Sequence, residues 1–549
     1  MVGCSNEQVP TPSNPLPVDV DGGMGGMGGA GGDAGMGGAG GAGGMGGAGG
    51  TGGAGGMGGA GGTGGGGGHA PVVTDCVAEV GPPEVTKVGM PGKLRLVGCV
   101  VTPDKAFAGE VLIESDTLTC VGASCADAPG AADATVVETN GIILPGMIDT
   151  HNHILFDMFD ESDWSPSKPY GNHNQWPNEP RYQAMVDAKQ YMNGEGTPNL
   201  DPGFGCEMNK YGEMKGLVAG TTSIAGAANP IDKTCYGSLA RTIDQKSNDL
   251  GADKVQVSVL FPPSSGDSVC ANFASDKTDA FVVHCGEGVD ETARKQFTTL
   301  GTATTPDGCL YAPETTIVHG TAFGEAEFTK MADVGMSLVW SPRSNVFLYG
   351  GGTDLTKTTN VPLAMSLGIN VALAPDWSLG GSQNLLDELR FADRVDNEAF
   401  GDVLSPLMLV QMVTVNAAKA LGLSDVLGSL EVGKKADVTV IAGDGSVPFE
   451  SVLAARPRDV SLVVVNGVPL YGDAALVALG PAAPGCEALE ICGATKFACV
   501  AETGGTATNK FGQTWAEITQ ILTSELVAYD EMNLSEWDFA PLAPLVKCE

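Results

Sequence analysis

Two histidines separated by one residue stand out in the segment from Met147 to His153. The segment reads as a β-strand, in which side chains two residues apart point to the same face, so His151 and His153 would lie side by side. Imidazole nitrogens are common zinc ligands, and the chain has only six histidines. The spacing therefore indicates half of a metal site. The alternative that it leaves open is a half-buried strand with two incidental histidines.

Three further strand-like runs end in residues of related chemistry. One apolar run leads to His284, with Glu287 three residues later, a second leads to His319, and a third leads to Asp376. Taken alone, a histidine in such a place is more often simply hydrogen-bonded, and an aspartate is usually a cap. Together with the histidine pair, these residues predict a site of histidine and carboxylate ligands for a divalent metal.

The elements that must position these residues alternate between strand-like and helix-like segments, which is typical of an α/β barrel. In such a barrel the carboxyl ends of the strands converge on one face, where catalytic groups lie. The expected strands are Ile142–Ile148, Thr221–Ala225, Val255–Phe261, Ala280–Val283, Thr316–Val318, Ser337–Trp340 and Asn370–Ala374, with Leu239–Ile243 as a weak eighth candidate.

These motifs resemble those of the amidohydrolase superfamily, in the branch of triazine chlorohydrolases and aminohydrolases and of cytosine and guanine deaminases. The resemblance covers about residues 92–475. It implies an α/β fold with a (β/α)8 TIM-like barrel at 141–424 and a small composite β-sandwich formed by residues 88–140 and 425–475. The motifs that carry it are Pro145–His153, Gly220–Ser223, His284–Glu287, Val318–Gly320, Ser341–Asn345, Asp376 with Asn384–Leu389, and Gly428–Val438.

The resemblance also implies a role for each site residue. Glu287 would carry a proton from water to the leaving nitrogen, His319 would hydrogen-bond the developing oxyanion, and Asp376 would also accept a proton from the water. The residues that would bind one divalent metal, with an open position for an activated water, are His151, His153, His284 and Asp376.

The number of metals follows from a missing lysine. Dinuclear members of the family use a carboxylated lysine at the end of a middle strand. Here the corresponding run Val255–Phe261 is followed by Pro262 and Pro263, and its nearest lysine, Lys254, lies at the opposite end. We therefore expect one metal per chain, with zinc favoured over iron, since histidine and carboxylate ligands suit both.

The stretch from Phe156 to Met185 is long and rich in aromatic residues. As a lid over the pocket it would let Trp164, His173 and Trp176 stack on a planar ring or hydrogen-bond to it. The alternative is a packed surface loop. Arg343 is expected to bind a substrate carboxylate or carbonyl, with a surface salt bridge as the alternative.

These residues favour a metal-dependent hydrolase of C–N bonds other than peptide bonds. Deamination of a heterocyclic or ring amine is the leading interpretation, because His-x-x-Glu with Asp376 suits the replacement of an amine at an sp² carbon. The alternatives are cyclic-amide opening, as in imidazolonepropionases, and a surface metal- or ligand-binding protein without turnover. The motifs His-Glu-x-x-His and Gly-x-Ser-x-Gly are absent, as is the His-x-Glu and Pro-Cys-x-x-Cys pattern of the small zinc deaminases.

The charge balance bears on partners. Acidic residues outnumber basic ones by 65 to 29, which gives a formal net charge of −36. Such a surface repels nucleic acid and anionic lipid, and no apolar run approaches the roughly 20 residues that span a bilayer. A small molecule is therefore the expected partner, and the sequence is compatible with a homodimer.

The first 70 residues predict an exported, tethered protein. Residues 22–68 are almost entirely glycine with alanine, methionine and threonine. Such a segment cannot bury enough apolar surface to offset the conformational entropy lost on ordering. We therefore expect a disordered linker at 22–70. Residues 1–21 resemble a lipoprotein start, because Val2-Gly3-Cys4 is similar to the end of a bacterial lipoprotein signal. The basic and apolar parts of such a signal are missing. We expect a lipid anchor at Cys4 in the cell envelope or at the surface, with a cytoplasmic protein as the alternative.

The chain has 14 cysteines, more than a cytosolic enzyme of this size usually carries. Cys4 is the expected anchor, and Cys285 is expected to be a core thiol. The remaining cysteines are even in number, which favours disulfides. Cys120/Cys125 and Cys486/Cys492/Cys499 are the expected loop staples, and reduced buried cysteines are the alternative. Residues 476–549 are expected to form a cysteine-containing extension with one helix at Thr514–Ala528.

Overall fold

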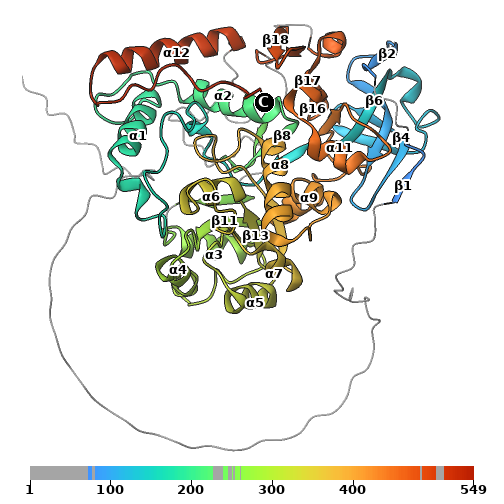
Figure 1. Ribbon diagram of the computed structural model, residues 1–549. Coiled ribbons are helices and arrows are strands. Elements are labelled where there is room, and N and C mark those ends of the chain that lie inside the picture. The colour runs from blue at the N-terminus through green and yellow to red at the C-terminus, as the bar shows by residue number, and fades with distance from the viewer. Residues whose placement is uncertain are drawn as a thin grey trace, which may run out of the picture. The chain divides into compact units, whose positions relative to one another are not determined.

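The computed structural model describes residues 72–76, 81–226, 239–244, 250, 254–259, 261–481, 485–501 and 512–548. Two parallel sheets and one large mixed sheet give an α/β fold with a separate β-sheet domain (Figure 1). The expected lipoprotein-like segment 1–21 and the glycine-rich linker 22–70 lie outside the described residues.

A five-stranded parallel sheet bears His284 and His319, and Glu287 and Asp376 follow two of its strands. Its three middle strands are buried on both faces, which is why they read as continuous apolar runs. In sheet order they are β10 (Val255–Ser258), β11 (Ala280–Cys285), β12 (Thr315–His319), β13 (Ser337–Trp340) and β14 (Asn370–Leu373). The helices of this region, seen around the sheet in Figure 1, are α3 (Gly266–Phe273), α4 (Glu291–Gly301), α5 (Glu325–Val334), α6 (Pro342–Tyr349) and α7 (Val361–Ser366).

A three-stranded parallel sheet delivers the histidine pair. It consists of β7 (Met147–Asp149), β8 (Thr221–Ile224) and β9 (Arg241–Thr242). Just beyond β7 and β14, the backbone of Asn152 forms a parallel bridge with that of Asp376. His153 N donates to Asp376 O at 2.7 Å, and Asp376 N donates to His151 O at 3.2 Å. The two sheets therefore meet where the expected ligands lie.

The expected strand Ile142–Ile148 is wrong in one respect, because it is two strands of different sheets. Its first half ends β6 (Thr135–Pro145) of the large sheet, and β7 begins at Met147. The break falls at Gly146, where a Cβ would come within 2.2 Å of Thr222 Oγ1. The chain thus passes between the two sheets at a point where only glycine fits.

The large sheet joins segments that lie before and after the parallel strands in the sequence. β6 pairs in antiparallel register with the strand Val438–Ile441, with Ile143 opposite Val440, so the two distant β-rich stretches share one sheet. This sheet has 11 strands, and its last two strands lie past residue 475. The other strands are β1 (Val72–Thr74), β2 (Glu84–Lys87), β3 (Lys93–Val101), β4 (Lys105–Glu114), β5 (Thr117–Gly122), β15 (Val438–Ile441), β16 (Val460–Val465), β17 (Val468–Asp473), β18 (Glu487–Ile491) and β19 (Ala494–Ala498).

The C-terminal extension packs on the helices that follow the histidine pair (Figure 1). Helix α12 (Trp515–Glu531) begins one residue after the expected start and extends three residues beyond the expected end at Ala528. Thr514 is its N-cap, and Glu517 completes a capping box there. Trp515 stacks on Tyr211 of α2 (Gly205–Leu217) with ring centroids 5.3 Å apart. Further along, Ala543 N donates to Met158 O at 3.0 Å. The remaining helices include α1 (Pro180–Met192), α8 (Leu385–Val395), α9 (Pro406–Met412), α10 (Val415–Ala420) and α11 (Pro448–Ala454).

Disulfides hold the described cysteines, as expected. Cys120 pairs with Cys125, and Cys486 pairs with Cys499, whereas Cys492 reaches the distant Cys548. Cys206 is disulfide-bonded as well. Cys285 is free and buried, so it is a core thiol. The remaining pairs are Cys76–Cys99 and Cys270–Cys309.

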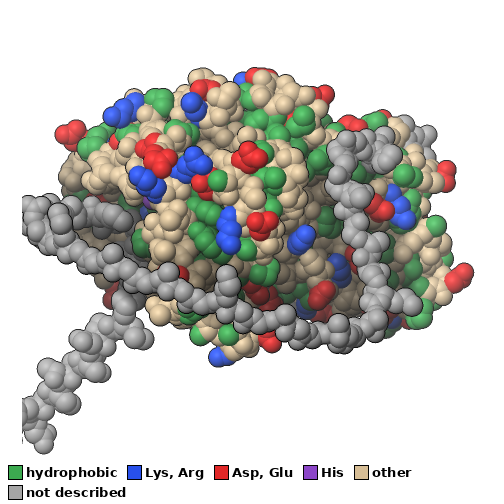
Figure 2. Space-filling model, turned by 90° about the horizontal axis from the view of Figure 1, so that it is seen from below, with side chains coloured by type: hydrophobic (Ala, Val, Ile, Leu, Met, Phe, Trp, Pro, Cys, Tyr) green, Lys and Arg blue, Asp and Glu red, His purple; other side chains and the backbone are tan. Residues whose placement is uncertain are grey.

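The surface is of mixed charge on the face seen in Figure 2, where lysine and arginine side chains are interspersed with aspartate and glutamate. Within the described part of the chain, no helix is both long and apolar enough to cross a bilayer.

Candidate metal-dependent active site

Five potential ligands gather at the carboxyl ends of the parallel strands. His151, His284, His319 and Asp376 are buried, and one ligand atom from each lies within 4.8 Å of the others. His151 Nε2 is 2.9 Å from Asp376 Oδ1, and His153 Nε2 is 3.4 Å from the same oxygen. The group of four does not include His153, although His153 Nε2 reaches the same oxygen of Asp376.

Two of these residues have a backbone conformation that side chains rarely adopt. His319 ends β12 and Asp376 follows β14, and both have φ of 72°. Non-glycine residues in this left-handed region are strained, and such strain gathers at functional sites. The strand ends thus hold His319 and Asp376 in positions that packing elsewhere must stabilise.

Burial favours the neutral form of His284 and His319, and the neutral form is the one that binds metals. Burial, reinforced by the neighbouring His151, lowers the pKa of His284 well below its usual value. Burial also lowers the pKa of His319, against the attraction of Glu287. For Asp376, burial raises the pKa and outweighs the opposing influence of His319.

The hydrogen-bond network assigns the tautomer of His284. Its Nδ1 lies 3.2 Å from the carbonyl oxygen of Ser258, which can only accept, so Nδ1 carries the proton. Its Nε2 lone pair is therefore free for a metal. Metal-binding histidines commonly donate their second nitrogen to a carbonyl in this way.

The network assigns the opposite tautomer to His319. Trp340 Nε1 donates to Thr358 Oγ1 at 2.8 Å, so the Thr358 hydroxyl donates onward to Asn345 Oδ1 at 3.2 Å. The amide nitrogen of Asn345 then faces His319 Nδ1 at 3.2 Å. Because Nδ1 accepts, the proton of His319 is on Nε2, which makes His319 a hydrogen-bond donor in the site.

Glu287 lies opposite that donor and is 6% exposed. Its Oε2 is 3.9 Å from His319 Nε2 and 3.2 Å from His173 Nδ1. Its Oε1 accepts from the Tyr349 hydroxyl at 2.7 Å. Burial acts to raise the pKa of Glu287, but His319 and His173 outweigh it and lower that pKa. The lowered pKa keeps the Glu287 carboxylate ionised.

The donor set fits a divalent metal of the zinc type. Imidazole nitrogen and carboxylate oxygen suit zinc and iron, and the Nε2 of His284 is available. Ser344 Oγ donates to the other oxygen of Asp376, Oδ2, at 2.5 Å. That bond leaves Oδ1 directed at His151 and His153.

Comparison with known proteins agrees with this site. The profile of the Amidohydrolase family matches residues 268–470. The 5-methylthioadenosine/S-adenosylhomocysteine deaminase of Desulfitobacterium hafniense strain Y51 is 26% identical over 407 residues, which cover 68% of this chain and 90% of that protein. Residues 268–470 of the chain therefore resemble the Amidohydrolase family. A second relative is the 5'-deoxyadenosine deaminase of Methanothermobacter thermautotrophicus, 22% identical over 68% of this chain and 91% of that protein.

Solved structures share the fold of this chain. A mutant atrazine chlorohydrolase from Arthrobacter aurescens TC1, complexed with zinc and atraton, gives a TM-score of 0.53 at 18% identity. It covers 69% of this chain and 95% of the chlorohydrolase. The chlorohydrolase complexed with zinc gives a TM-score of 0.50 at 17% identity, with the same coverage.

The long aromatic segment Phe156–Met185 lies against the site. His173 contacts Glu287, as described above. Trp164 is fully buried and donates from Nε1 to Glu179 at 2.8 Å, and Trp176 is 9% exposed. Both rings pack on Trp377, which lies 5.8 Å from the His153 ring. Contact of Trp164 and Trp176 with a substrate stays a prediction.

Arg343 points toward helix α8. Its guanidinium lies 4.8 Å above the ring of Phe391, and its backbone nitrogen donates to Glu388 Oε1 at 3.2 Å. The positive charge of Arg343 acts on Glu388, whose pKa burial raises to about 7. A role of Arg343 in binding a substrate stays a prediction.

Several residues that hold the site are not among those predicted from the sequence. Ser344 and Asn345 lie in the quoted motif Ser341–Asn345, so a signal for them existed. Trp377 adjoins Asp376, which is also a usable signal. Tyr349 and Gln296 belong to helices whose sequence gives no hint that they reach the site.

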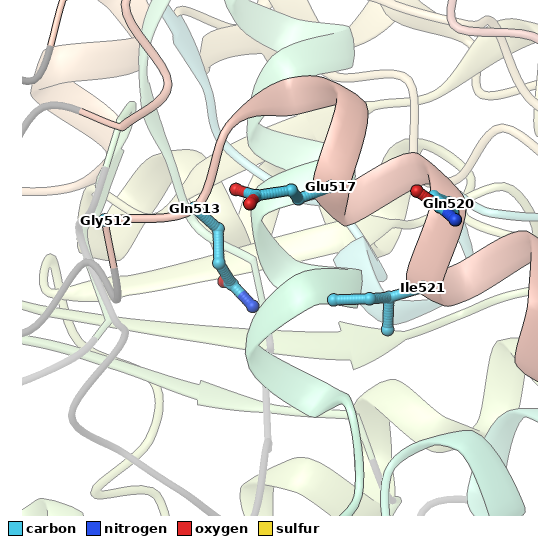
Figure 3. Close-up of a pocket in the computed structure, with 5 residues that line it drawn as sticks. All are labelled: Gly512, Gln513, Glu517, Gln520 and Ile521. Atoms are coloured by element: carbon cyan, nitrogen blue, oxygen red, sulfur yellow. The ribbon is translucent and has the colours of Figure 1, made fainter.

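A surface pocket of about 300 Å³ lies at the start of α12 (Figure 3). It shares no lining residue with the candidate metal site. No predicted site residue lines it, and its Gln513 donates to Glu207 of α2 at 2.6 Å. Its lining residues are Gly512, Gln513, Glu517, Gln520 and Ile521.

Proposed function

We propose that this protein is a metal-dependent deaminase that hydrolyses the bond between a ring carbon and an exocyclic amine of a nitrogen heterocycle. One observation carries the proposal. The buried carboxylate of Glu287 faces the protonated Nε2 of His319 across 3.9 Å, beside the cluster of metal ligands. Proton acceptor, hydrogen-bond donor and ligands thus surround one point, as hydrolysis at an sp² carbon requires.

The relatives support the same class of substrate. Those reported above are deaminases of methylthioadenosine, S-adenosylhomocysteine and 5'-deoxyadenosine, all of which carry an amine on a purine ring. We propose an amine-bearing purine, pyrimidine or triazine as the substrate.

For the metal we propose one zinc ion held by His151, His153, His284 and Asp376. The tautomer of His319 supports this set, because a protonated Nε2 cannot bind a metal. When bound, zinc would supply Lewis acidity and lower the pKa of a water in the site.

The residues of the chain then divide the work. Glu287 takes a proton from the attacking water and delivers it to the leaving amine. His319 donates from Nε2 to the atom on which negative charge develops. Ser344 keeps Asp376 oriented through its bond to Oδ2.

We further propose that the two parallel sheets are arcs of one eight-stranded barrel. The bridge between Asn152 and Asp376 supports closure on one side, where β7 lies next to β14. The parallel direction of every strand pair in both sheets supports it as well.

We also propose that the protein works outside the cytosol, as the lipoprotein interpretation of Cys4 requires. The disulfides of the described residues support this, since such bonds persist in oxidising compartments. Fractionation of the producing cells, followed by detection of the protein, tests it, and recovery in the cytosol would refute it.

The function is tested by measuring bound metal and then ammonia release over a panel of amine-bearing purines, pyrimidines and triazines. We expect stoichiometric zinc and ammonia from at least one compound. Opening of cyclic amides without ammonia would support the imidazolonepropionase-like alternative. Bound metal without any turnover would support a ligand-binding protein.

A further inference from the structure

Two side chains that do not bind metal hold the carboxylate of Glu287, one on each oxygen. Tyr349, at the end of α6, donates to Oε1 at 2.7 Å, and it is 2% exposed. His173 reaches Oε2 with its Nδ1 at 3.2 Å. A carboxylate with both oxygens engaged from different elements cannot rotate freely, so its direction is set before a substrate arrives.

The proton of His173 can be located from its other partner. Gly286 N donates to Gln296 Oε1 at 2.8 Å, which fixes the orientation of that amide. The amide nitrogen of Gln296 is therefore the atom 3.1 Å from His173 Nε2. Because that amide nitrogen donates, His173 Nε2 accepts, and the proton lies on Nδ1, facing Glu287.

The backbone fixes this arrangement as well. The long aromatic segment forms an antiparallel bridge between Asn172 and Gly288, and His173 N donates to Glu287 O at 3.2 Å. Gly288 permits the approach, because it has φ of 143° and a Cβ there would lie 2.5 Å from Gly171 O. His173 is thus held by the segment that precedes it and by the strand end that bears Glu287.

We propose that Tyr349 and His173 are positioning residues that orient the Glu287 carboxylate for proton transfer, with Gln296 selecting the Nδ1–H tautomer of His173. The proposal rests on the proposed deaminase function. It gives the aromatic segment a part in catalysis through His173, and the substrate contacts that the sequence predicts for this segment stay predictions.

Turnover of the variants tests the proposal on a compound from the ammonia panel. Tyr349→Phe removes only the hydroxyl, and we expect kcat to fall about 10- to 100-fold, as for loss of a hydrogen bond to a charged group, with KM within about twofold and zinc content unchanged. Tyr471→Phe is the matched control, because it removes a buried hydroxyl in β17 of the β-sheet domain. Unchanged kcat in Tyr349→Phe would overturn the proposal.

Two replacements of His173 separate positioning from packing. Asparagine places a donor close to the position of Nδ1, whereas glutamine places one close to Nε2. We therefore expect His173→Asn to keep about tenfold more kcat than His173→Gln. Equal kcat in the two variants would contradict the role of the Nδ1 donor.

A measurement without substrate separates this proposal from the deaminase function. Nitrogen-15 shifts of the histidine rings in the zinc-loaded enzyme report each tautomer, and the His173 signals are those lost in His173→Asn. We expect the proton on Nδ1, and a move away from that tautomer in Gln296→Leu. A proton on Nε2 in the unsubstituted enzyme would overturn the proposal even if no panel compound is deaminated.

Discussion

The histidines of the site are distinguished by what their second nitrogen contacts. His284 donates a hydrogen bond from Nδ1 to a backbone carbonyl, whereas His319 accepts a hydrogen bond at Nδ1 from the side-chain amide of Asn345. The same side chain therefore becomes a ligand in one place and a hydrogen-bond donor in the other. By distance alone His319 belongs to the group of four possible ligands. Its tautomer is what assigns it the role of hydrogen-bond donor instead of metal ligand.

That distinction gives a test at the level of single ligands. We expect His153→Ala to lose most bound zinc, because an imidazole that contributes to the coordination is gone. His319→Ala should retain zinc and lose turnover, since it removes only a donor. Elemental analysis after dialysis measures both, and zinc lost from His319→Ala but kept by His153→Ala would reverse the assignment.

The proton acceptor can be tested without disturbing the ligands. Glu287→Gln keeps the shape and the hydrogen bond from Tyr349 but cannot take up a proton. We expect ammonia release to fall about 10²- to 10⁴-fold, the usual contribution of general acid–base catalysis, with zinc content unchanged. Asp127→Asn, at an exposed carboxyl, serves as the control, and full activity in Glu287→Gln would exclude the proton-transfer role.

At the scale of elements, helix α6 supports three residues of the site at once. Ser344 bonds to Asp376, Asn345 bonds to His319, and Tyr349 bonds to Glu287. One rigid helix thus sets the relative positions of groups that come from three different strand ends. A site positioned by regular structure is more precise than one built on loops.

The sequence predicts the strands better than it predicts this support. An apolar run that ends in histidine or aspartate is recognisable, because burial on both faces removes the polar alternation of an exposed strand. The break at Gly146 escaped prediction because it depends on the approach of Thr222 from a distant part of the chain. Tyr349 escaped for the same reason, since its partner Glu287 lies 62 residues away.

A buried network links the two loops that carry the ligands. Asp157, beyond His153, accepts from Ser378 N, beyond Asp376, at 3.0 Å. Gln383 donates to Ser378 O at 3.1 Å and accepts from Lys215 at 2.8 Å. Burial raises the pKa of Asp157 to about 6, against the attraction of Lys215.

This shift makes stability depend on pH in a stated direction. A carboxyl with a raised pKa in the folded state contributes stability that is fully present below about pH 4 and is lost as pH rises through 6. Asp157→Asn cannot ionise and still accepts from Ser378. We compare the free energy of unfolding of Asp157→Asn with that of the unsubstituted protein. We expect the difference to shift in favour of the variant by about 3 kcal/mol between pH 4 and pH 7.5.

Urea unfolding at the two pH values measures the difference, with Asp127→Asn as the exposed control. The difference in free energy of unfolding between Asp157→Asn and the unsubstituted protein should change with pH. A constant difference would show that folding does not raise the pKa of Asp157.

At the scale of the whole molecule, the C-terminal extension braces the loop beyond His153. Ala543 bonds to Met158, Phe539 packs on Phe159 with ring centroids 6.1 Å apart, and Lys547 pairs with Asp160 at 3.1 Å. The extension therefore helps to support the metal site. The sequence did not predict this, because the extension lies outside the residues that resemble the family.

The disulfide between Cys492 and Cys548 anchors this brace, and its loop is long. In the chain-entropy account, a closure of 56 residues stabilises by about 4 kcal/mol, against about 2 kcal/mol for the 5-residue closure of Cys120–Cys125. We expect serine replacement of both Cys492 and Cys548 to lower Tm more than the same replacement at Cys120 and Cys125. Calorimetry of the two double variants measures this, and an equal or smaller loss would contradict the brace.

The brace also has a consequence for the time course of folding. Tyr211 bonds to Ala543 across 332 residues and Lys547 bonds to Glu161 across 386. Contacts between such distant residues form slowly, because much of the chain must be ordered before they are made. The loop beside His153 is thus among the last parts to become fixed, and uptake of zinc during refolding should follow the slowest step rather than the initial collapse.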